Sequence, residues 1–236
     1  MIDINCDLGE GLNNEHLLMP YISTCNIACG GHAGNEKTMN RVVNLAAKNK
    51  VKIGAHPSYP DIENFGRKSI EISMEGLKKT LVHQIQALEK IVLDSGHQMH
   101  HIKPHGALYN DVAKNESIAF SFLYAIQDYK TKCKLYVPFG SVIERKAKQS
   151  GFTIIYEAFA DRNYNDDLSL VSRQKNNAII SNPNEIIKHI SLIKNDGKVK
   201  TISGKKVSIK ADTFCVHSDT KNAVEIVKNI HKSFNP

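Results

Sequence analysis

Short apolar runs alternate with helical segments along the whole chain. Seven runs have the period of two or the β-branched composition that is typical of strands, and they cover residues 2–6, 22–28, 51–55, 99–103, 134–137, 153–156 and 213–216. Between these runs, apolar residues recur at spacings of three and four, which predicts helices over residues 36–50, 74–93, 117–126, 141–148, 184–193 and 219–230. This alternation favours an α/β fold with a parallel sheet, open or closed.

A single domain is favoured over two. The 236 residues fit one larger core or two small ones, but no Pro/Ser-rich linker, repeat or break in composition divides them. Residues 197–210, with Gly204 and two lysines at their centre, predict a hairpin added to the αβ pattern. We therefore expect one domain over residues 1–236 with a hairpin insertion near residues 197–210.

Composition excludes several classes of protein. The chain is 41% hydrophobic and 23% charged, close to globular averages, which argues against disorder, collagen and coiled coil. No stretch approaches the roughly 20 apolar residues of a membrane span, and the N-terminus is acidic and alternating rather than basic and then apolar. Five cysteines, an odd number, fit a reducing compartment and buried, inert thiols. We expect a cytoplasmic protein.

The formal net charge of +7 and the eleven histidines suggest different kinds of function. Basic charge can indicate nucleic-acid binding, whereas histidines can indicate metal binding or proton transfer. The lysines are spread over predicted helices and connections, without interleaved aromatic residues and with no Trp. This distribution is typical of a solvated surface and not of a nucleic-acid groove.

Polar residues follow the C-terminal ends of six predicted strands. In parallel αβ barrels the loops at that edge converge and form the active site. The distribution predicts a closed barrel with a site at one mouth. The residues in question are Asp7 and Glu10; Asn26 and His32; His56; Lys103, His105 and Tyr109; Glu157, Asp161 and Arg162; and His217.

The first strand carries an alternation of polar residues. Asp3, Asn5 and Asp7 share one side of it, and if that side is the barrel interior, a buried carboxylate needs a partner or a cation. Lys103 ends its strand before a proline, which aims its ammonium inwards, where Asp7 or Glu157 can pair with it.

The histidines divide into three sets by position. His32 lies in a glycine-rich turn before a helix, and His56 and His105 end strands beside prolines, where an imidazole can act as a general base or as a metal ligand. His97, His100 and His101 flank a strand start at the opposite barrel end, and no chemistry is assigned to them. The histidines on predicted helices are assigned to the surface or to packing: His16, His83, His189 and His231. For the neighbours Asp161 and Arg162, a structural ion pair is the alternative to a role in binding.

Two common motifs are missing from the sequence. No Gly-x-x-x-x-Gly-Lys-Ser/Thr phosphate loop is present, and Gly204-Lys205-Lys206 lacks both its spacing and its context. No Gly-x-Ser-x-Gly nucleophile elbow is present either.

The same segments carry a family resemblance. From Asp3 to Asp219, in order, the motifs resemble those of the LamB/YcsF family. They are DxNxDxGE from Asp3, NIACGxHAG from Asn26, GAHPSYPD from Gly54, FGR from Phe65, KPHGALYN from Lys103, ExFADRxY from Glu157 and CVH from Cys215.

The resemblance implies both a fold and an activity. The fold is a distorted seven-stranded β/α (TIM-like) barrel of the glycoside hydrolase/deacetylase type. The activity is that of a bacterial 5-oxoprolinase, which cleaves 5-oxoproline (pyroglutamate), a cyclic amide or lactam, to glutamate with ATP hydrolysis, together with partner subunits B and C. ATP would then be a co-substrate and would bind with Mg²⁺. Assembly of this chain into a homo-oligomer is compatible with the resemblance.

Four positions depart from the family pattern. The family usually has a bulky residue at Gly31 and Asp at Asn35, and glycine at Leu168 and Ser218. These departures bear on the local loop shapes and on the choice of substrate.

The sequence-based roles follow from lactam hydrolysis, which needs a base for water, a cation for the oxyanion and a clamp for the substrate carboxylate. The residues expected in catalysis are Asp7, Glu10, His32, His56, His105 and Lys103. Those expected to bind substrate are Asn5, Asn26, Tyr109, Glu157, Asp161, Arg162 and His217.

Two alternatives remain open at this stage. One is a metal-dependent amide or sugar hydrolase in which Asp7, His56 and His105 hold the ion, a donor set that suits zinc-like coordination with an open position. The other is a non-catalytic subunit that organises its partners.

Overall fold

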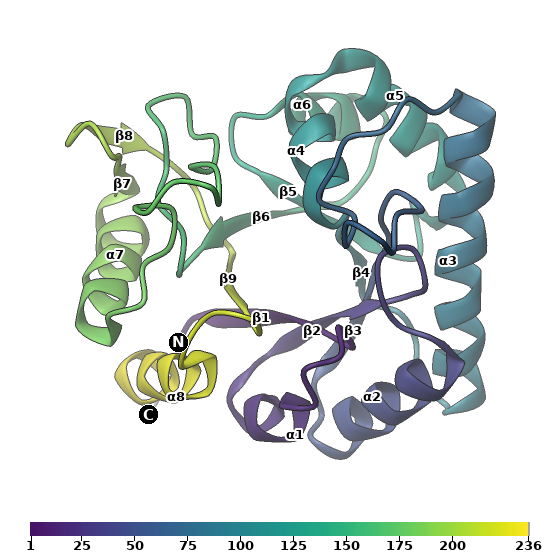
Figure 1. The fold of residues 1–236 in the computed structure, drawn as a ribbon, viewed down its shortest axis with the longest axis horizontal. Helices are drawn as coiled ribbons and strands as arrows, with labels where there is room; N and C mark the ends of the chain where they lie inside the picture. The colour runs from purple at the N-terminus through teal and green to yellow at the C-terminus, as the bar shows by residue number, and fades with distance from the viewer. Residues whose placement is uncertain (236) are drawn as a thin grey trace.

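The computed structural model describes residues 1–235 as a closed ring of strands with helices outside it (Figure 1). Every neighbouring pair in the ring is parallel, and the sheet closes where the last strand pairs with both the first and the sixth. In barrel order the strands are β1 (Asp3–Leu8), β2 (Thr24–Ala28), β3 (Lys52–His56), β4 (His101–Ile102), β5 (Lys134–Pro138), β6 (Ile154–Phe159) and β9 (Thr213–His217). The seven-stranded β/α barrel expected from the sequence is confirmed.

The helices follow the predicted pattern closely. They are α1 (Glu15–Leu18), α2 (Glu36–Lys48), α3 (Met74–Asp94), α4 (Gly106–Lys114), α5 (Glu116–Ala125), α6 (Val142–Gln149), α7 (Pro183–Asp196) and α8 (Ala223–Phe234), with 3-10 turns η1 (Met19–Tyr21) and η2 (Gln127–Tyr129). Helices α2, α3, α5, α6 and α7 begin within one residue of the predicted start. Helix α8 begins later than expected, because Asn222 before it takes a left-handed conformation (φ 63°).

Helix α4 was not predicted, because Pro104 and Gly106 indicate a loop. Gly106 is its first residue and has φ +55°, and a Cβ there would lie 2.5 Å from the Gly66 carbonyl oxygen. The Ala107 amide donates to that same oxygen at 2.9 Å. The close approach fixes the start of α4 directly after His105, so this histidine is held between β4 and a helix.

Alternation along β1 separates the apolar layer from the barrel interior. Ile4, Cys6 and Leu8 are buried in the hydrophobic core, which packs between strands and helices. The side chains of Asn5 and Asp7 point into the ring, where they bond to other strands. This is the interior placement that the period of two predicted.

The last third of the chain adds structure outside the ring. After α7, the antiparallel pair β7 (Lys198–Lys200) and β8 (Lys206–Ser208) forms a hairpin beside that helix (Figure 1). Ile2 and Asn235 lie side by side, since the Asn235 side chain bonds to both the amide and the carbonyl of Ile2. Across the described residues, no helix combines the length and apolar character that a membrane crossing requires.

Candidate active site at the barrel mouth

Two carboxylates share one ammonium at the centre of the barrel. Lys103 Nζ lies 2.9 Å from Asp7 Oδ1 and 2.9 Å from Glu157 Oε1, and all three side chains are buried. Lys103 was expected to aim inwards with Asp7 or Glu157 as its partner, and it contacts both. A buried charge is retained only when such partners compensate its desolvation.

Electrostatics keeps Asp7 and Lys103 ionised at neutral pH. Burial raises the pKa of Asp7, but His56 and Lys103 outweigh it and hold that pKa well below its usual range. Burial also opposes the charge of Lys103, yet Asp7, with a smaller contribution from Glu157, holds the pKa of this ammonium well above its usual range. Lys103 is therefore committed to the site's own carboxylates.

A chain of hydrogen bonds inside the barrel supports Asp7 from below. Asn26 donates through Nδ2 to Asp7 Oδ1 (2.7 Å) and to Asn5 Oδ1 (2.8 Å), and Asn5 donates to Thr213 (2.9 Å). Asn5 and Asn26, both expected to bind substrate, lie beneath the mouth, and neither lines the cleft there. The structure gives them a role in orienting Asp7.

His101 also joins this interior chain, although we expected no role for it. Its Nε2 lies 2.6 Å from Asn26 Oδ1, which only accepts, so this nitrogen carries the hydrogen. The ring is fully buried and stacks on Tyr136 at a centroid distance of 4.0 Å. His101 is the first residue of β4, at a strand start as expected, but its side chain turns into the interior, so the expectation that it has no role is corrected.

Three histidines and Glu10 form a second cluster at the mouth. Glu10 Oε1 lies 3.0 Å from His32 Nε2, 3.4 Å from His105 Nδ1 and 3.9 Å from His56 Nε2. His105 Nδ1 is 3.0 Å from His56 Nε2, and the His32 and His105 rings stack at a centroid distance of 3.5 Å. Burial lowers the pKa of His32 and His105, so both rings are neutral at neutral pH.

The loop after β3 holds this cluster in place. The Phe65 carbonyl accepts a hydrogen bond from His105 Nε2 (3.0 Å), and the Phe65 ring packs edge-on against His32 and His105. A Cβ on Gly66 would lie only 3.0 Å from the His32 Cβ and 3.1 Å from His105 Cδ2. A larger residue at position 66 would push the rings apart.

Asp161 and Arg162 do not form an ion pair with each other. Asp161 accepts hydrogen bonds from the His217 amide (3.0 Å) and from the Thr220 hydroxyl (2.5 Å), with His217 Nδ1 at 3.1 Å. Arg162 instead donates to the carbonyls of Val171 (2.6 Å) and Ala178 (3.3 Å). The two neighbours point to opposite sides of the chain, as successive residues of an extended segment do.

A cleft of about 760 Å³ opens over these groups. Asp7, Glu10, His56, Lys103 and His105 form part of its floor. Its rim is rich in cations that the sequence analysis did not single out, and the lining includes Arg67, Lys68, Lys114, Arg173 and Lys175. Arg67 belongs to the FGR motif that begins at Phe65, so this motif was the signal in the sequence that could have pointed to the cationic rim.

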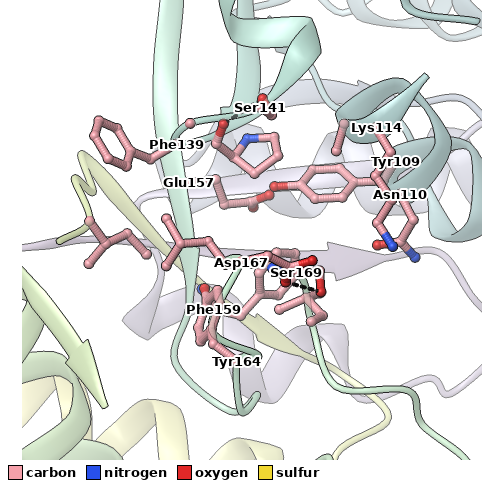
Figure 2. A pocket seen from close by; sticks show the side chains of 16 residues that line it. Tyr109, Asn110, Lys114, Phe139, Ser141, Glu157, Phe159, Tyr164, Asp167 and Ser169 are labelled. Atoms are coloured by element: carbon pink, nitrogen blue, oxygen red, sulfur yellow. Dashed lines mark hydrogen bonds between the residues drawn. The ribbon is translucent and has the colours of Figure 1, made fainter. Parts of the chain in front are cut away.

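A smaller cavity of about 100 Å³ lies beside the cleft and shares Tyr109 and Phe159 with it. Figure 2 shows the Tyr109 hydroxyl pointing towards the Glu157 carboxylate across this cavity. Among the described residues, neither this hydroxyl nor either Glu157 oxygen makes a well-aligned hydrogen bond. Glu157 Oε1 is nevertheless paired with the Lys103 ammonium, so Glu157 Oε2 and the Tyr109 hydroxyl are the polar atoms left to face the cavity.

The structure shows what surrounds three of the four positions that depart from the family pattern. The space beside Gly31 is occupied by Gln84 and Ser58, since a Cβ at position 31 would lie 2.3 Å from Gln84 Oε1. Asn35 caps α2 by accepting from the Thr38 amide. Leu168 has φ +65°, a conformation that favours the family's glycine. The structure does not explain Ser218.

The five cysteines are free and buried, as expected for inert thiols. Burial raises the pKa of Cys25 and Cys29 to about 12. Cys215 differs from the others because it contacts the central ion pairs, which was not expected from the sequence. Its Sγ lies 3.1 Å from Lys103 Nζ. Burial raises its pKa as well, so the thiol stays protonated beside the ion pairs.

The donor atoms group differently from the expected metal set of Asp7, His56 and His105. Glu10, His32, His56 and His105 each offer a ligand atom within 4.8 Å of the others, whereas Asp7 groups with Cys215 and His217. Asp7 Oδ2 is 3.5 Å from His56 Nε2, but Asp7 is engaged by Lys103 and Asn26. The cluster of Glu10 and the three histidines therefore brings together more potential ligand atoms than the expected set does.

A closed β/α barrel that gathers buried ionised side chains at the carboxyl ends of its strands has the organisation of a barrel enzyme. The chain belongs to the LamB/YcsF family, whose sequence model matches residues 2–236. Similar curated proteins include the 5-oxoprolinase A subunits of Bacillus cereus strain 03BB102, 39% identical, and of Bacillus anthracis strain A0248, 38% identical. Each alignment covers 99% of this chain and 94% of the relative.

Solved structures agree with this placement. The lactam utilization protein from Thermus thermophilus superposes with a TM-score of 0.91 at 31% identity, covering 98% of this chain and 95% of that one. A putative cellobiose-phosphate cleavage protein from Enterococcus faecalis V583 has a TM-score of 0.56 at 12% identity, over 98% and 94% of the two chains. The second likeness extends to the fold alone.

Proposed function

We propose that this chain is the A subunit of an ATP-dependent 5-oxoprolinase. The complex hydrolyses 5-oxo-L-proline to L-glutamate, coupled to ATP hydrolysis, and its other subunits are B and C. The observation that carries the proposal is the name shared by relatives that are 38–39% identical over 99% of the chain. A cytoplasmic location fits a reaction that uses ATP with Mg²⁺.

The chemistry explains why ATP is needed. Resonance stabilises the lactam amide against attack by water. Transfer of the γ-phosphoryl group to the amide oxygen makes the carbonyl carbon more electrophilic. Water then adds to that carbon, and the carbon–nitrogen bond breaks as the ring nitrogen takes up a proton, which leaves an acyl phosphate. A second water hydrolyses the acyl phosphate and releases glutamate and inorganic phosphate. Because this sequence has no phosphate loop, we place most of the nucleotide contacts on the partner subunits.

Arg162 is the group best suited to hold the substrate carboxylate. Its side chain lines the cleft and is only 5% exposed, yet no carboxylate of the described residues lies within ion-pair distance of it. A buried cation without a counterion is costly, and a bound anion removes that cost. The guanidinium is fixed by two main-chain carbonyls, so it is ordered before substrate arrives.

We place the lactam ring in the small cavity beside the cleft that Arg162 lines. Phe159 and Leu168 give this cavity apolar walls for the ring methylenes. The Tyr109 hydroxyl and Glu157 Oε2, the carboxylate oxygen that does not contact Lys103, are placed to meet the ring N–H and, after cleavage, the new amine. In this arrangement Glu157 accepts from the ring N–H, and the Tyr109 hydroxyl supplies a proton.

The clusters around Asp7 and Glu10 act on the water and on the developing oxyanion. Asp7 is ionised and fixed by Lys103 and Asn26, which suits it to orient a water molecule. Glu10 and the neutral imidazoles of His32 and His105 face the same cleft and can take up or pass on its proton.

Purified chain, assayed with and without subunits B and C, tests the proposal. The full mixture should release glutamate and phosphate from 5-oxoproline and ATP, and omission of this chain should abolish glutamate release. If the full mixture, shown by size-exclusion chromatography to be assembled, releases no glutamate, the assignment is wrong.

A further inference from the structure

The hydrogen bonds around His56 and His105 fix the tautomers of both rings. His56 Nδ1 lies 2.8 Å from the Lys103 carbonyl oxygen, and His105 Nε2 lies 3.0 Å from the Phe65 carbonyl oxygen. A carbonyl oxygen only accepts, so each of these outer nitrogens carries the hydrogen of a neutral ring. The two inner nitrogens, His56 Nε2 and His105 Nδ1, are left as bare lone pairs 3.0 Å apart.

Glu10 brings a third acceptor to the same point. Its Oε1 is 3.4 Å from His105 Nδ1 and 3.9 Å from His56 Nε2. On the other side of this oxygen, His32 Nε2 lies at 3.0 Å and can donate to it. With both rings neutral, three electron-rich atoms thus face one another in a largely buried site. Such an arrangement is repulsive unless a proton or a metal cation lies between the three atoms.

We propose that Glu10, His56 and His105 bind a divalent transition-metal ion of the zinc type. Tetrahedral zinc, with bonds of about 2.0–2.1 Å, places neighbouring donors about 3.3–3.4 Å apart, and the three donor separations here run from 3.0 to 3.9 Å. Imidazole donors select such ions over Mg²⁺ or Ca²⁺. The three protein ligands leave a coordination position open towards the cleft.

The surroundings are those of a built metal site. Ligating histidines usually donate their second N–H to a carbonyl or carboxylate, which fixes the ring, and both histidines do so here. His32 is a positioning residue, because it orients Glu10 and does not reach the ion. Its ring is stacked parallel to His105, so its in-plane lone pair cannot converge with that of His105 on one ion.

This site differs from the metal set expected from the sequence, because Glu10 replaces Asp7. It also does not depend on the proposed 5-oxoprolinase activity. An ion here would occupy the lone pairs of Glu10 and His105 that otherwise serve proton transfer, and it would instead lower the pKa of a bound water and polarise an oxygen of any substrate that enters the cleft.

Metal content of the isolated chain tests the inference. The purified chain is stripped with a chelator, dialysed against Zn²⁺ or Co²⁺, and analysed by mass spectrometry and by visible absorption of Co²⁺. We expect one tightly bound ion per chain, with the intense absorption of tetrahedral Co²⁺. Glu10→Gln and His105→Ala should each weaken binding by at least about tenfold, whereas His83→Ala, at an exposed helical histidine, should bind as the wild type does.

Two variants, His32→Phe and Glu10→Gln, add to the test of metal binding. His32→Phe retains a ring against His105 but cannot donate to Glu10, so binding should weaken while the unfolding midpoint is preserved. Glu10→Gln is nearly isosteric and decides the matter if His105→Ala does not fold.

The inference is overturned if the wild-type chain binds no stoichiometric ion, in which case a shared proton lies between His56 and His105. It is equally overturned if Glu10→Gln binds as tightly as the wild type. Because neither ATP nor 5-oxoproline is present, a failure here is distinct from a failure of the glutamate assay.

Discussion

The ammonium of Lys103 lies 2.9 Å from the carboxylate of Asp7 inside the barrel, although 96 positions separate the two residues in the chain. The parallel ring brings them together, because β1 and the end of β4 both deliver their last inward side chain to the same mouth. Glu157 contacts the same ammonium from β6. One lysine thus compensates two carboxylates, and much of the site depends on it.

Replacing Lys103 with Met should destabilise the protein strongly. The change leaves Asp7 and Glu157 buried without their cation, which costs about 3–5 kcal/mol in free energy of unfolding. Urea unfolding followed by circular dichroism measures this loss. Lys48→Met, at an exposed lysine on α2, should change the free energy by less than about 0.5 kcal/mol. Equal effects of the two changes would contradict the central role of Lys103.

His101 should make stability depend on pH in mildly acid solution. Burial, with smaller contributions from the neighbouring His100, Lys103 and His56, lowers its folded-state pKa well below the usual value, while Asp7 opposes this shift. Below about pH 6.5 the unfolded chain therefore binds a proton that the folded chain does not, and the free energy of unfolding falls as the pH falls.

The slope from this one group is up to about 1.4 kcal/mol per pH unit. His101→Gln should reduce the slope between pH 6 and pH 5 by about that amount, as unfolding at several pH values would show. His83→Gln, at an exposed position, should leave it unchanged. A slope that His101→Gln does not alter would mean that the buried ring titrates normally.

Gly106→Ala should cost more than the same change at Gly204. Both glycines have positive φ, but a Cβ at Gly204 meets nothing within 4 Å, whereas at Gly106 it lies 2.5 Å from the Gly66 carbonyl oxygen. We expect about 1–2 kcal/mol for the left-handed backbone at Gly204 and about 1–3 kcal/mol more at Gly106 from overpacking. Similar losses in urea unfolding would show that the contact with Gly66 is loose.

Asp7→Asn separates the catalytic hypothesis from the partner-organising one. A catalytic Asp7 should lose at least about 100-fold in kcat for glutamate release when its charge is removed, while an organising subunit should keep its activity. Glu36→Gln, at an exposed acid in the first turn of α2, is the control and should keep full activity. Size-exclusion chromatography must show the same assembly for both variants, and full activity in assembled Asp7→Asn would refute the catalytic role.

The local elements could be predicted because their causes are local. The period of two in β1 and the spacing of apolar residues in α2 and α3 are properties of neighbouring residues, and they placed these elements well. Helix α4 escaped prediction because its start depends on a contact between Gly106 and Gly66, which lie 40 positions apart. No local pattern records such a contact.

Sequence by itself determined the alternation of strands and helices, the edge that carries the polar residues, and the inward direction of Asp7 and Lys103, since these follow from periodicity and from the order of elements. Closure of the sheet was indicated by the polar residues at six strand ends and by the family resemblance. Only the tertiary structure decided the partners. It joined His101 to Asn26, separated Asp161 from Arg162, and grouped His56 and His105 with Glu10 instead of Asp7. The reason is physical: side-chain partnership requires an approach of a few ångströms, which depends on register, loop shape and rotamer, and none of these is encoded by spacing along the chain.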